Sequence, residues 1–170
     1  MQKCVEYRSC VNLPKVASFL IGKNKMKIVS VNVKQLNKYS KDPEFLNKSR
    51  RPCVLIVQLK YKGKRYNFAV PFRSNIPAAS PKDEYFPLPP RSTTREGNRH
   101  GLHYIKMFPI RNDCLEIYHT EGNVAATLYK AIIDKNQKQI VSECQKYLQK
   151  YENGEIPNYA TDIDLLLSLM

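Results

Sequence analysis

The sequence lacks the features that mark several common classes of protein. No stretch approaches about 18 consecutive apolar residues, so no helix is expected to span a membrane. The N-terminal region has no continuous apolar segment with a small-residue cleavage site, and we expect no signal peptide. The five cysteines are irregularly spaced without a CxxC pair, which argues against a zinc site and a thiol redox centre. A reducing cytoplasm is the simplest compartment for such a chain.

Motifs for nucleotide and metal chemistry are also absent. The sequence contains no P-loop, no GxGxxG, no HExxH and no acidic pair at metal-site spacing. Its one Asp-rich spot, Asp162 and Asp164, precedes an apolar segment and is better explained as a helix cap. We therefore predict no metal site and no cofactor, and expect any catalysis to be metal-independent.

Acidic residues are scarce in one part of the chain. Residues 26–75 contain twelve Lys or Arg and two acids, and so carry +10 of the formal net charge of +13. Such a concentrated block is typical of a polyanion-binding surface, and we favour nucleic acid as the partner. The alternatives are a solvated basic surface that aids solubility and, more weakly, an anionic membrane surface, for which no basic amphipathic helix is evident.

Residues 53–74, CVLIVQLKYKGKRYNFAVPFRS, predict a β-hairpin. Its turn is Lys62-Gly63-Lys64, in which Gly63 supplies a positive φ. Pro71 is expected to end the second strand because it cannot donate a backbone hydrogen bond. Strict alternation gives each strand two faces. The first strand is expected to place on one face Val54, Ile56, Gln58 and Lys60, and on the other Leu55, Val57, Leu59 and Tyr61. The second strand is expected to form an apolar face of Tyr66, Phe68, Val70 and Phe72.

The rest of the chain predicts strands first and helices last. Strands are expected at the N-terminal side of Asn32, at 101–110 and at 115–118, with a short helix capped by Asn32 and a long irregular stretch over 73–101. Helical periodicity over 124–151 is divided near residue 136, and Thr161 is expected to cap a terminal helix. We predict one α+β domain over residues 1–170 with a small, strongly curved antiparallel sheet, in which residues 1–25 form an N-terminal extension with a short helix.

Arg73, Ser74 and Asn75 are the candidate phosphate-binding and catalytic residues. A guanidinium, a hydroxyl and an amide presented together suit a phosphodiester. Without a metal, RNA is cleaved by its own 2′-OH, and the protein needs only to orient it and stabilise the charged phosphorane. The alternative is a polar turn that ends a strand, for which Ser and Asn are common.

Two groups of cations are candidates for contact with the RNA backbone. The first lies on the hairpin and the second in the preceding loop. The hairpin group is Lys60, Lys62, Lys64 and Arg65. The loop group is Lys48, Arg50 and Arg51. The alternative for the hairpin group is a charged edge that prevents strand pairing between molecules.

His103 is the candidate general acid or base, because the reference pKa of histidine lies near the operating pH. A lone histidine on a strand is also a common packed or surface residue, and both interpretations remain open. His100 is expected to be exposed in the preceding loop, where it could contact RNA.

Three stretches resemble the ToxN/AbiQ family of type III toxin–antitoxin endoribonucleases, in particular its CptN-like members. MKIVSVNVKQLNKY is similar to the family's opening strand and helix, VLIVQLKYKGKRYNFAVPFRS to its glycine-turn hairpin, and GLHYIKMFPI to a later strand. The resemblance covers residues 26–170. It implies a small barrel-like fold similar to that of the MazF/Kid toxins. It also implies a bacterial toxin, active in phage defence, that cleaves cellular mRNA without metal. The toxin would process and bind a structured antitoxin RNA in a protein–RNA ring.

The resemblance also implies site residues. The family's Thr-Ser-Pro-Lys active-site segment aligns with residues 73–76, so Ser74 carries over directly and Arg73 replaces the threonine. Ile76 stands at the lysine position, whose charge Arg73 could supply. A family tyrosine falls near Phe45, and the family's loop lysine falls near Arg50 or Arg51.

Two rival functions remain. A non-catalytic RNA-binding protein would use the same basic hairpin. A DNA-binding regulator is less favoured, because the long helices are near neutral and none offers a basic recognition face.

Overall fold

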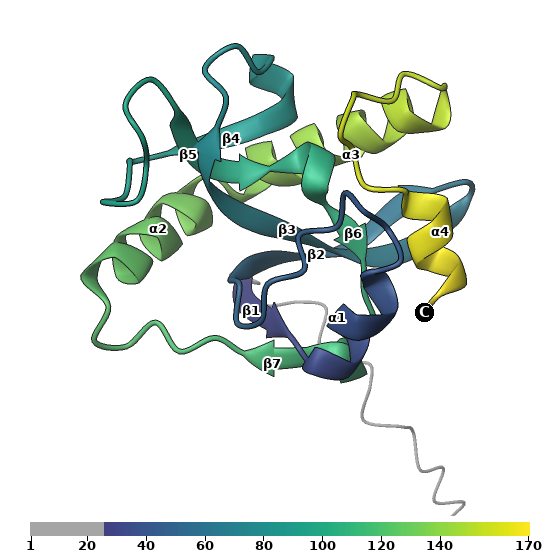
Figure 1. Cartoon of the computed structure of the whole chain (residues 1–170), viewed down its shortest axis with the longest axis horizontal. Helices are drawn as coiled ribbons and strands as arrows, with labels where there is room; N and C mark the ends of the chain where they lie inside the picture. Colours follow the sequence, from purple (N-terminus) through teal and green to yellow (C-terminus); the bar gives the residue numbers. More distant parts are fainter. Residues whose placement is uncertain (1–25) are drawn as a thin grey trace, which may run out of the picture.

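Within residues 26–170, the strands form one antiparallel sheet of seven strands, flanked by helices on both faces (Figure 1). The computed structural model describes residues 26–170, so the short helix expected within residues 1–25 lies outside the described residues. The strands are β1 (Lys27–Val31), β2 (Cys53–Tyr61), β3 (Lys64–Ile76), β4 (Tyr85–Leu88), β5 (Arg99–His103), β6 (Phe108–Pro109) and β7 (Leu115–Ile117). The α-helices are α1 (Val33–Tyr39), α2 (Val124–Lys135), α3 (Gln137–Glu152) and α4 (Ile163–Ser168).

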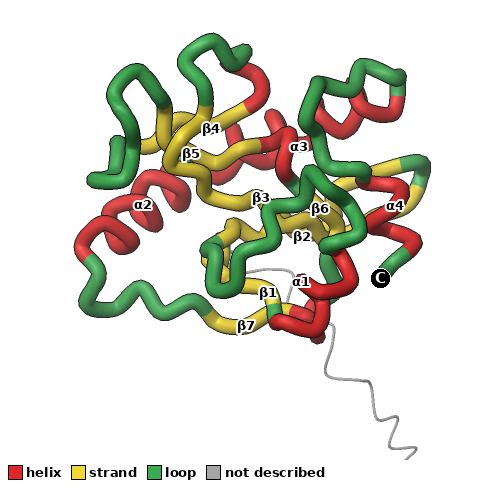
Figure 2. The backbone as a smooth tube through the Cα atoms, in the orientation of Figure 1, coloured by secondary structure: helices red, strands yellow, loops and turns green. Residues whose placement is uncertain are grey.

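The strand order is β4-β5-β3-β2-β1-β7, and β6 pairs with β3 beside this path. The two end strands, β4 and β7, do not pair with each other, so the curved sheet stays open. The predicted α+β class with a strongly curved antiparallel sheet is confirmed. The tube in Figure 2 shows how β3 runs through the centre of the sheet and connects its two halves.

Hydrophobic side chains fill both faces of the sheet. On one face, Ile56, Phe68 and Val70 pack with residues of α2 and α3, including Ile133 and Leu148. A second cluster on the other face joins α1 to the loop at residues 40–52 and to α4; it includes Leu36, Phe45, Leu55, Phe108 and Leu166. Burial on both faces fixes the position of β3, which carries the candidate site.

The hairpin forms as predicted, but a β-bulge changes its faces. Ile56 pairs with Phe68 and Leu59 pairs with Tyr66, so two residues of β2 lie opposite Asn67 alone. Gln58 occupies the bulge with φ of 62°, and its backbone N–H donates to Asn67 Oδ1. The extra residue reverses the alternation. Leu59 and Tyr61 therefore join Val54 and Ile56 in one core cluster, and the strict two-face assignment for β2 is wrong.

Pro71 does not end β3, and this prediction is wrong. The N–H of Phe72 donates to Pro52 O at 3.1 Å, on the β2 side of the strand. The preceding Pro71 nitrogen therefore points to the other side, where the partner changes from β6 at Ala69 to β5 at Phe72. No ladder hydrogen bond is lost at that gap, so the proline is tolerated within the sheet.

The stretch predicted as a long irregular loop contains more regular structure than expected. β4 lies within it, paired with β5, and β5 begins at Arg99. The strand predicted at 101–110 is instead β5, a single 3-10 turn over Tyr104–Lys106, and β6. Gly101 allows this arrangement, because a Cβ there would lie 2.1 Å from Phe86 O on β4.

The helices follow the predicted spacing closely. Asn32 caps α1 by accepting from Gln35 N, and α2 and α3 divide at Asn136. The terminal helix exists, but its cap is Asp162 rather than Thr161, since Asp162 accepts from Leu165 N at 3.0 Å. The Thr161 hydroxyl instead donates to Met107 O at 2.6 Å in the interior.

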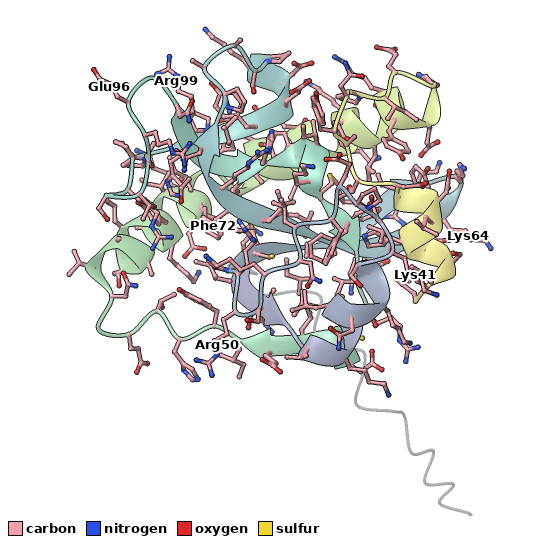
Figure 3. The ribbon with its side chains drawn as sticks, viewed as in Figure 1. Lys41, Arg50, Lys64, Phe72, Glu96 and Arg99 are labelled. Atoms are coloured by element: carbon pink, nitrogen blue, oxygen red, sulfur yellow. The ribbon has the colours of Figure 1, made fainter. Side chains whose placement is uncertain are left out.

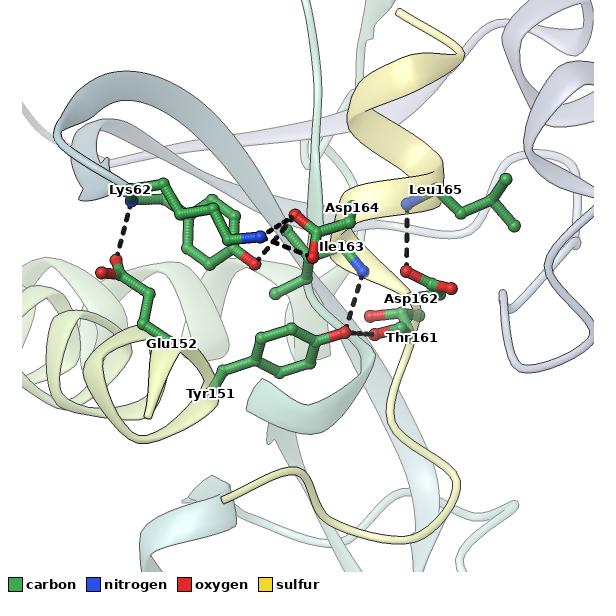
Figure 4. Close-up of polar contacts among 9 residues, drawn as sticks. Lys62, Tyr151, Glu152, Thr161, Asp162, Ile163, Asp164 and Leu165 are labelled. Carbon is green, nitrogen blue, oxygen red and sulfur yellow. Dashed lines mark hydrogen bonds and ion pairs between the residues drawn. The ribbon is translucent and has the colours of Figure 1, made fainter. Parts of the chain in front are cut away.

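A set of polar contacts attaches α4 to the tip of the hairpin and to the end of α3 (Figure 4). Lys62 Nζ lies 2.8 Å from both carboxylate oxygens of Asp164, and the Lys62 N–H donates to Glu152 Oε1 at 2.9 Å. Tyr61 OH donates to Asp164 Oδ1, while Tyr151 OH accepts from Ile163 N. One hairpin lysine is therefore already paired within the fold.

Cys53 and Cys144 are buried free thiols, and burial raises the pKa of Cys53 to about 12. Within residues 26–170, none of the helices is long and apolar enough to cross a membrane.

Candidate nucleic-acid site

The candidate site lies on β3, just after this strand leaves β2 and pairs with β5. Arg73 is opposite Gly101 of β5, and Phe72 is opposite Leu102. Residues 73–75 are therefore held within a strand rather than in a turn beyond its end. Their half-buried side chains are placed by the sheet itself.

Arg73 and His103 contact each other directly. Arg73 Nη1 lies 3.2 Å from His103 Nδ1. A guanidinium can only donate, so Nδ1 accepts and the neutral ring carries its proton on Nε2. That Nε2 is buried and has no hydrogen-bond partner among the described residues. The two candidates are thus brought together, with His103 buried and Arg73 half-buried.

The surroundings keep His103 neutral. Burial, followed by the charges of Arg73 and Lys106, lowers its pKa to about 3. Its side chain is 1% exposed. This geometry does not suit the predicted role of general acid or base, because neither ring nitrogen meets solvent with a free lone pair. His100, expected to be exposed, is also buried; its Nδ1 donates to Pro89 O at 2.8 Å and its ring lies against Tyr129.

Arg51 brings a second guanidinium from the loop at residues 40–52. Its Nη1 donates to Phe72 O at 3.2 Å, which places it beside β3. Burial lowers the pKa of Arg51, and the nearby positive charge of Arg73 lowers it further. Lys48 and Arg50 of the same loop are exposed, and Arg50 has φ of 56°. Arg51 and Arg73 therefore form one basic region, and Lys48 and Arg50 lie in the same loop as Arg51.

Ser74 and Asn75 hold the loop between β4 and β5. Thr93 Oγ1 donates to Ser74 Oγ at 3.2 Å, and Asn75 Nδ2 donates to Thr93 O at 3.1 Å. Asn75 Oδ1 accepts from Arg95 N at 2.8 Å and from Asn98 Nδ2 at 3.4 Å. These contacts give both residues a structural role beside any contact with RNA.

Two residues of the site were not singled out from the sequence. Lys106 is buried, and its Nζ donates to Glu44 Oε2 at 2.7 Å and to Glu44 O at 2.9 Å. The Glu44 charge opposes the effect of burial, which lowers the pKa of Arg73. The available signal was Lys106 itself, a lone charge inside the apolar run YIKMFPI.

The hairpin cations lie away from this region. Arg73 lies nine positions after Lys64 along β3, which corresponds to roughly 30 Å of extended strand. Figure 3 shows Lys64 at the hairpin end near α4, with Phe72, Arg50 and Arg99 far from it. Lys60, Lys64 and Arg65 are exposed, whereas Lys62 is paired with Asp164. The structure therefore contains two separate basic regions rather than one.

Within residues 26–170, no three His, Cys, Asp or Glu side chains are grouped so that they could hold a metal ion. Asp42, two residues before Glu44, accepts from Glu44 N and Asp162 N.

Comparison with solved structures identifies the fold. AbiQ, a lactococcal anti-phage endoribonuclease of a type III toxin–antitoxin system, aligns with a TM-score of 0.65 and 14% identity over 85% of this chain and 95% of AbiQ. The chain has the fold of type III toxin–antitoxin proteins. A second match (TM-score 0.58, 14% identity, 85% of this chain and 95% of the other) comes from work on selective toxin inhibition by a non-coding RNA pseudoknot in such systems.

A third structure supports the same assignment of the fold. It belongs to a bacterial antiviral system regulated by a processed non-coding RNA, with a TM-score of 0.61 and 17% identity over 84% of this chain and 96% of the other. No protein-family profile and no curated protein sequence matches the chain. The resemblance to the ToxN/AbiQ proteins found in the sequence is thus confirmed by three-dimensional similarity.

Proposed function

We propose that this protein is an endoribonuclease toxin of a type III toxin–antitoxin system, neutralised by its own structured RNA. It cleaves cellular mRNA and processes the antitoxin RNA without a metal ion, and it binds that RNA in a protein–RNA ring. The fold shared with AbiQ, an anti-phage endoribonuclease, supports the class of activity. In the systems of the two other matched structures, a non-coding RNA regulates the antiviral system or inhibits the toxin. This supports RNA as the class of partner.

The observation that carries the proposal is the half-buried guanidinium of Arg73 on β3. The sheet fixes its backbone, His103 Nδ1 accepts from one of its nitrogens, and Arg51 adds a second positive charge nearby. Guanidinium groups in this setting suit the non-bridging oxygens of a phosphodiester. In the proposed reaction Arg73 holds the scissile phosphate, and Ser74 positions the 2′-OH or a non-bridging oxygen.

A growth assay tests the proposal. Expression of the protein without its RNA should arrest the growth of a bacterial host. Arg73→Ala should abolish the arrest and weaken RNA binding, because a guanidinium contacts the ground state and the transition state alike. Arg99→Ala is the matched control, since Arg99 is an exposed arginine of β5 that forms no hydrogen bond with Arg73 or Arg51. A wild-type protein that leaves growth and RNA intact would contradict the proposal.

The second candidate is a non-catalytic RNA-binding protein. The hydrogen bonds of Ser74 and Asn75 to the loop at residues 91–98 favour it, because both side chains already have a structural use. A binding protein would leave growth unaffected and would keep RNA intact at saturating concentrations, so the same assay separates the two functions.

A further inference from the structure

Glu44 occupies a fixed position in the loop that follows α1. Its N–H donates to Asp42 Oδ1 at 2.9 Å. The next residue, Phe45, is buried with its ring edge-to-face against Tyr39 and Phe108, at centroid distances of 5.3 Å and 4.9 Å. The backbone at Glu44 is therefore anchored on both sides, although the loop has no regular secondary structure.

The Glu44 carboxylate is oriented by a buried lysine. Lys106 Nζ contacts both Oε2 and the backbone oxygen of Glu44, and the Lys106 side chain is 4% exposed. The Glu44 side chain is 37% exposed, and its Oε1 makes no hydrogen bond with any described residue. One carboxylate oxygen is thus tied down, while the other keeps its lone pairs available.

The same carboxylate is linked to Arg73 through Lys106 and His103, without pairing with it. Lys106 follows His103 by three residues in one 3-10 turn, and His103 accepts from Arg73. The Glu44 charge acts on Arg73 and raises its pKa against the effect of burial, yet the two side chains form no ion pair. The carboxylate and the guanidinium do not pair with each other, so both remain available to a bound RNA.

We infer that Glu44 is the general base of the reaction. This inference rests on the proposed endoribonuclease function and supplies the base that the buried His103 does not. Glu44 Oε1 takes the proton of the 2′-OH, and the 2′-oxygen attacks phosphorus to form a 2′,3′-cyclic phosphate. The P–O5′ bond breaks, the 5′-oxygen takes a proton from water, and Glu44 returns its proton to the resulting hydroxide. A positioned base contributes typically 10²–10⁴-fold to the rate.

Single-turnover cleavage of an RNA that the wild-type protein cuts tests this inference. Glu44→Gln keeps an acceptor for Lys106 but removes the basic oxygen, and cleavage should slow by at least about 100-fold. Lys106→Met removes the buried cation that orients the carboxylate but keeps the basic oxygen, so it should lower the melting temperature more than Glu44→Gln and slow cleavage less than Glu44→Gln does. Formate or acetate should restore cleavage to Glu44→Ala in a concentration-dependent way, whereas chloride should not.

The outcomes separate the base assignment from the proposed function. Cleavage by Glu44→Gln at the wild-type rate would overturn the assignment. Equal losses of cleavage rate in Glu44→Gln and Lys106→Met, together with no rescue of Glu44→Ala by formate, would also overturn it and would leave Glu44 and Lys106 as a structural pair. In either case the wild-type protein still cleaves RNA, so the proposed function stands. A wild-type protein that cleaves no RNA overturns both.

Discussion

Ser74 carries a hydroxyl that bonds to Thr93 and is also proposed to contact RNA. Two substitutions distinguish these uses. Ser74→Ala should slow cleavage by about 10²–10³, the usual cost of losing a transition-state donor. Thr93→Val removes the same Ser74–Thr93 hydrogen bond but keeps the serine, and should slow cleavage less than about 5-fold. Single-turnover rates measure both, and equal losses would show that Ser74 acts only by holding the loop.

His103 gives the fold a predictable sensitivity to acid. Its pKa is lowered from 6.5 to about 3, so between these values the unfolded chain binds a proton that the folded protein does not. Stability from this residue is therefore complete above pH 6.5 and falls as the pH drops toward 3. The loss is about 1.4 kcal/mol per pH unit, or about 2 kcal/mol at pH 5.

Denaturant unfolding at pH 7 and pH 5 measures this effect. His103→Gln should reduce the difference between the two pH values by about 2 kcal/mol. His119→Gln is the matched control, because His119 is exposed, and it should leave the difference unchanged. An unchanged difference in His103→Gln would show that His103 is protonated in the folded protein.

For single residues, the sequence indicates some members of the candidate site but not the contacts between them. Arg73 was selected by its residue type and its position near the end of an apolar strand, and His103 by its residue type alone. The Lys106–Glu44 pair joins residues 62 positions apart, and the burial of His100 depends on Phe72 and Tyr129 from other elements. Neither follows from local patterns, because each depends on tertiary packing.

The hairpin of β2 and β3 carries a basic edge that is separate from Arg73. We predict that it contributes electrostatic contacts with RNA. Replacing Lys60, Lys64 and Arg65 by Ala should weaken RNA affinity and flatten its salt dependence, by roughly one unit of slope per lost phosphate contact. Lys62→Ala should have a smaller effect than Lys64→Ala, because its ammonium is already paired with Asp164.

Binding measured across salt concentrations tests this prediction. Lys138→Ala combined with Lys146→Ala is the control, since both lysines are exposed on α3, outside the basic block of residues 26–75. The control should retain the wild-type slope. If the hairpin variant retains it as well, the hairpin is a charged edge and the RNA contacts lie in the loop at residues 40–52.

Helices and strands were predicted correctly where local sequence signals are strong. They were predicted incorrectly where the neighbouring strand decides the structure. Asn32, the Lys62-Gly63 turn and the division at Asn136 depend on local chemistry, and all three are found in the structure. The bulge at Gln58 and the continuation of β3 past Pro71 depend on which strand lies alongside. Strand pairing is non-local, so a single sequence does not reveal it.

The whole molecule is proposed to work without a metal ion. RNA cleavage should therefore survive EDTA at concentrations that silence a magnesium-dependent nuclease run in parallel. Loss of cleavage on chelation, with recovery on addition of magnesium, would contradict this expectation.

The most direct test of the account is the chemistry of the RNA ends. The purified protein should convert RNA into fragments with 2′,3′-cyclic phosphates or their opened form, and with 5′-hydroxyls. A 2′-deoxy nucleotide at the scissile position should block cleavage there, because it removes the nucleophile. Fragments that carry 5′-phosphates, or cleavage at the 2′-deoxy position, would mean that water attacks the phosphate and would contradict the central claim.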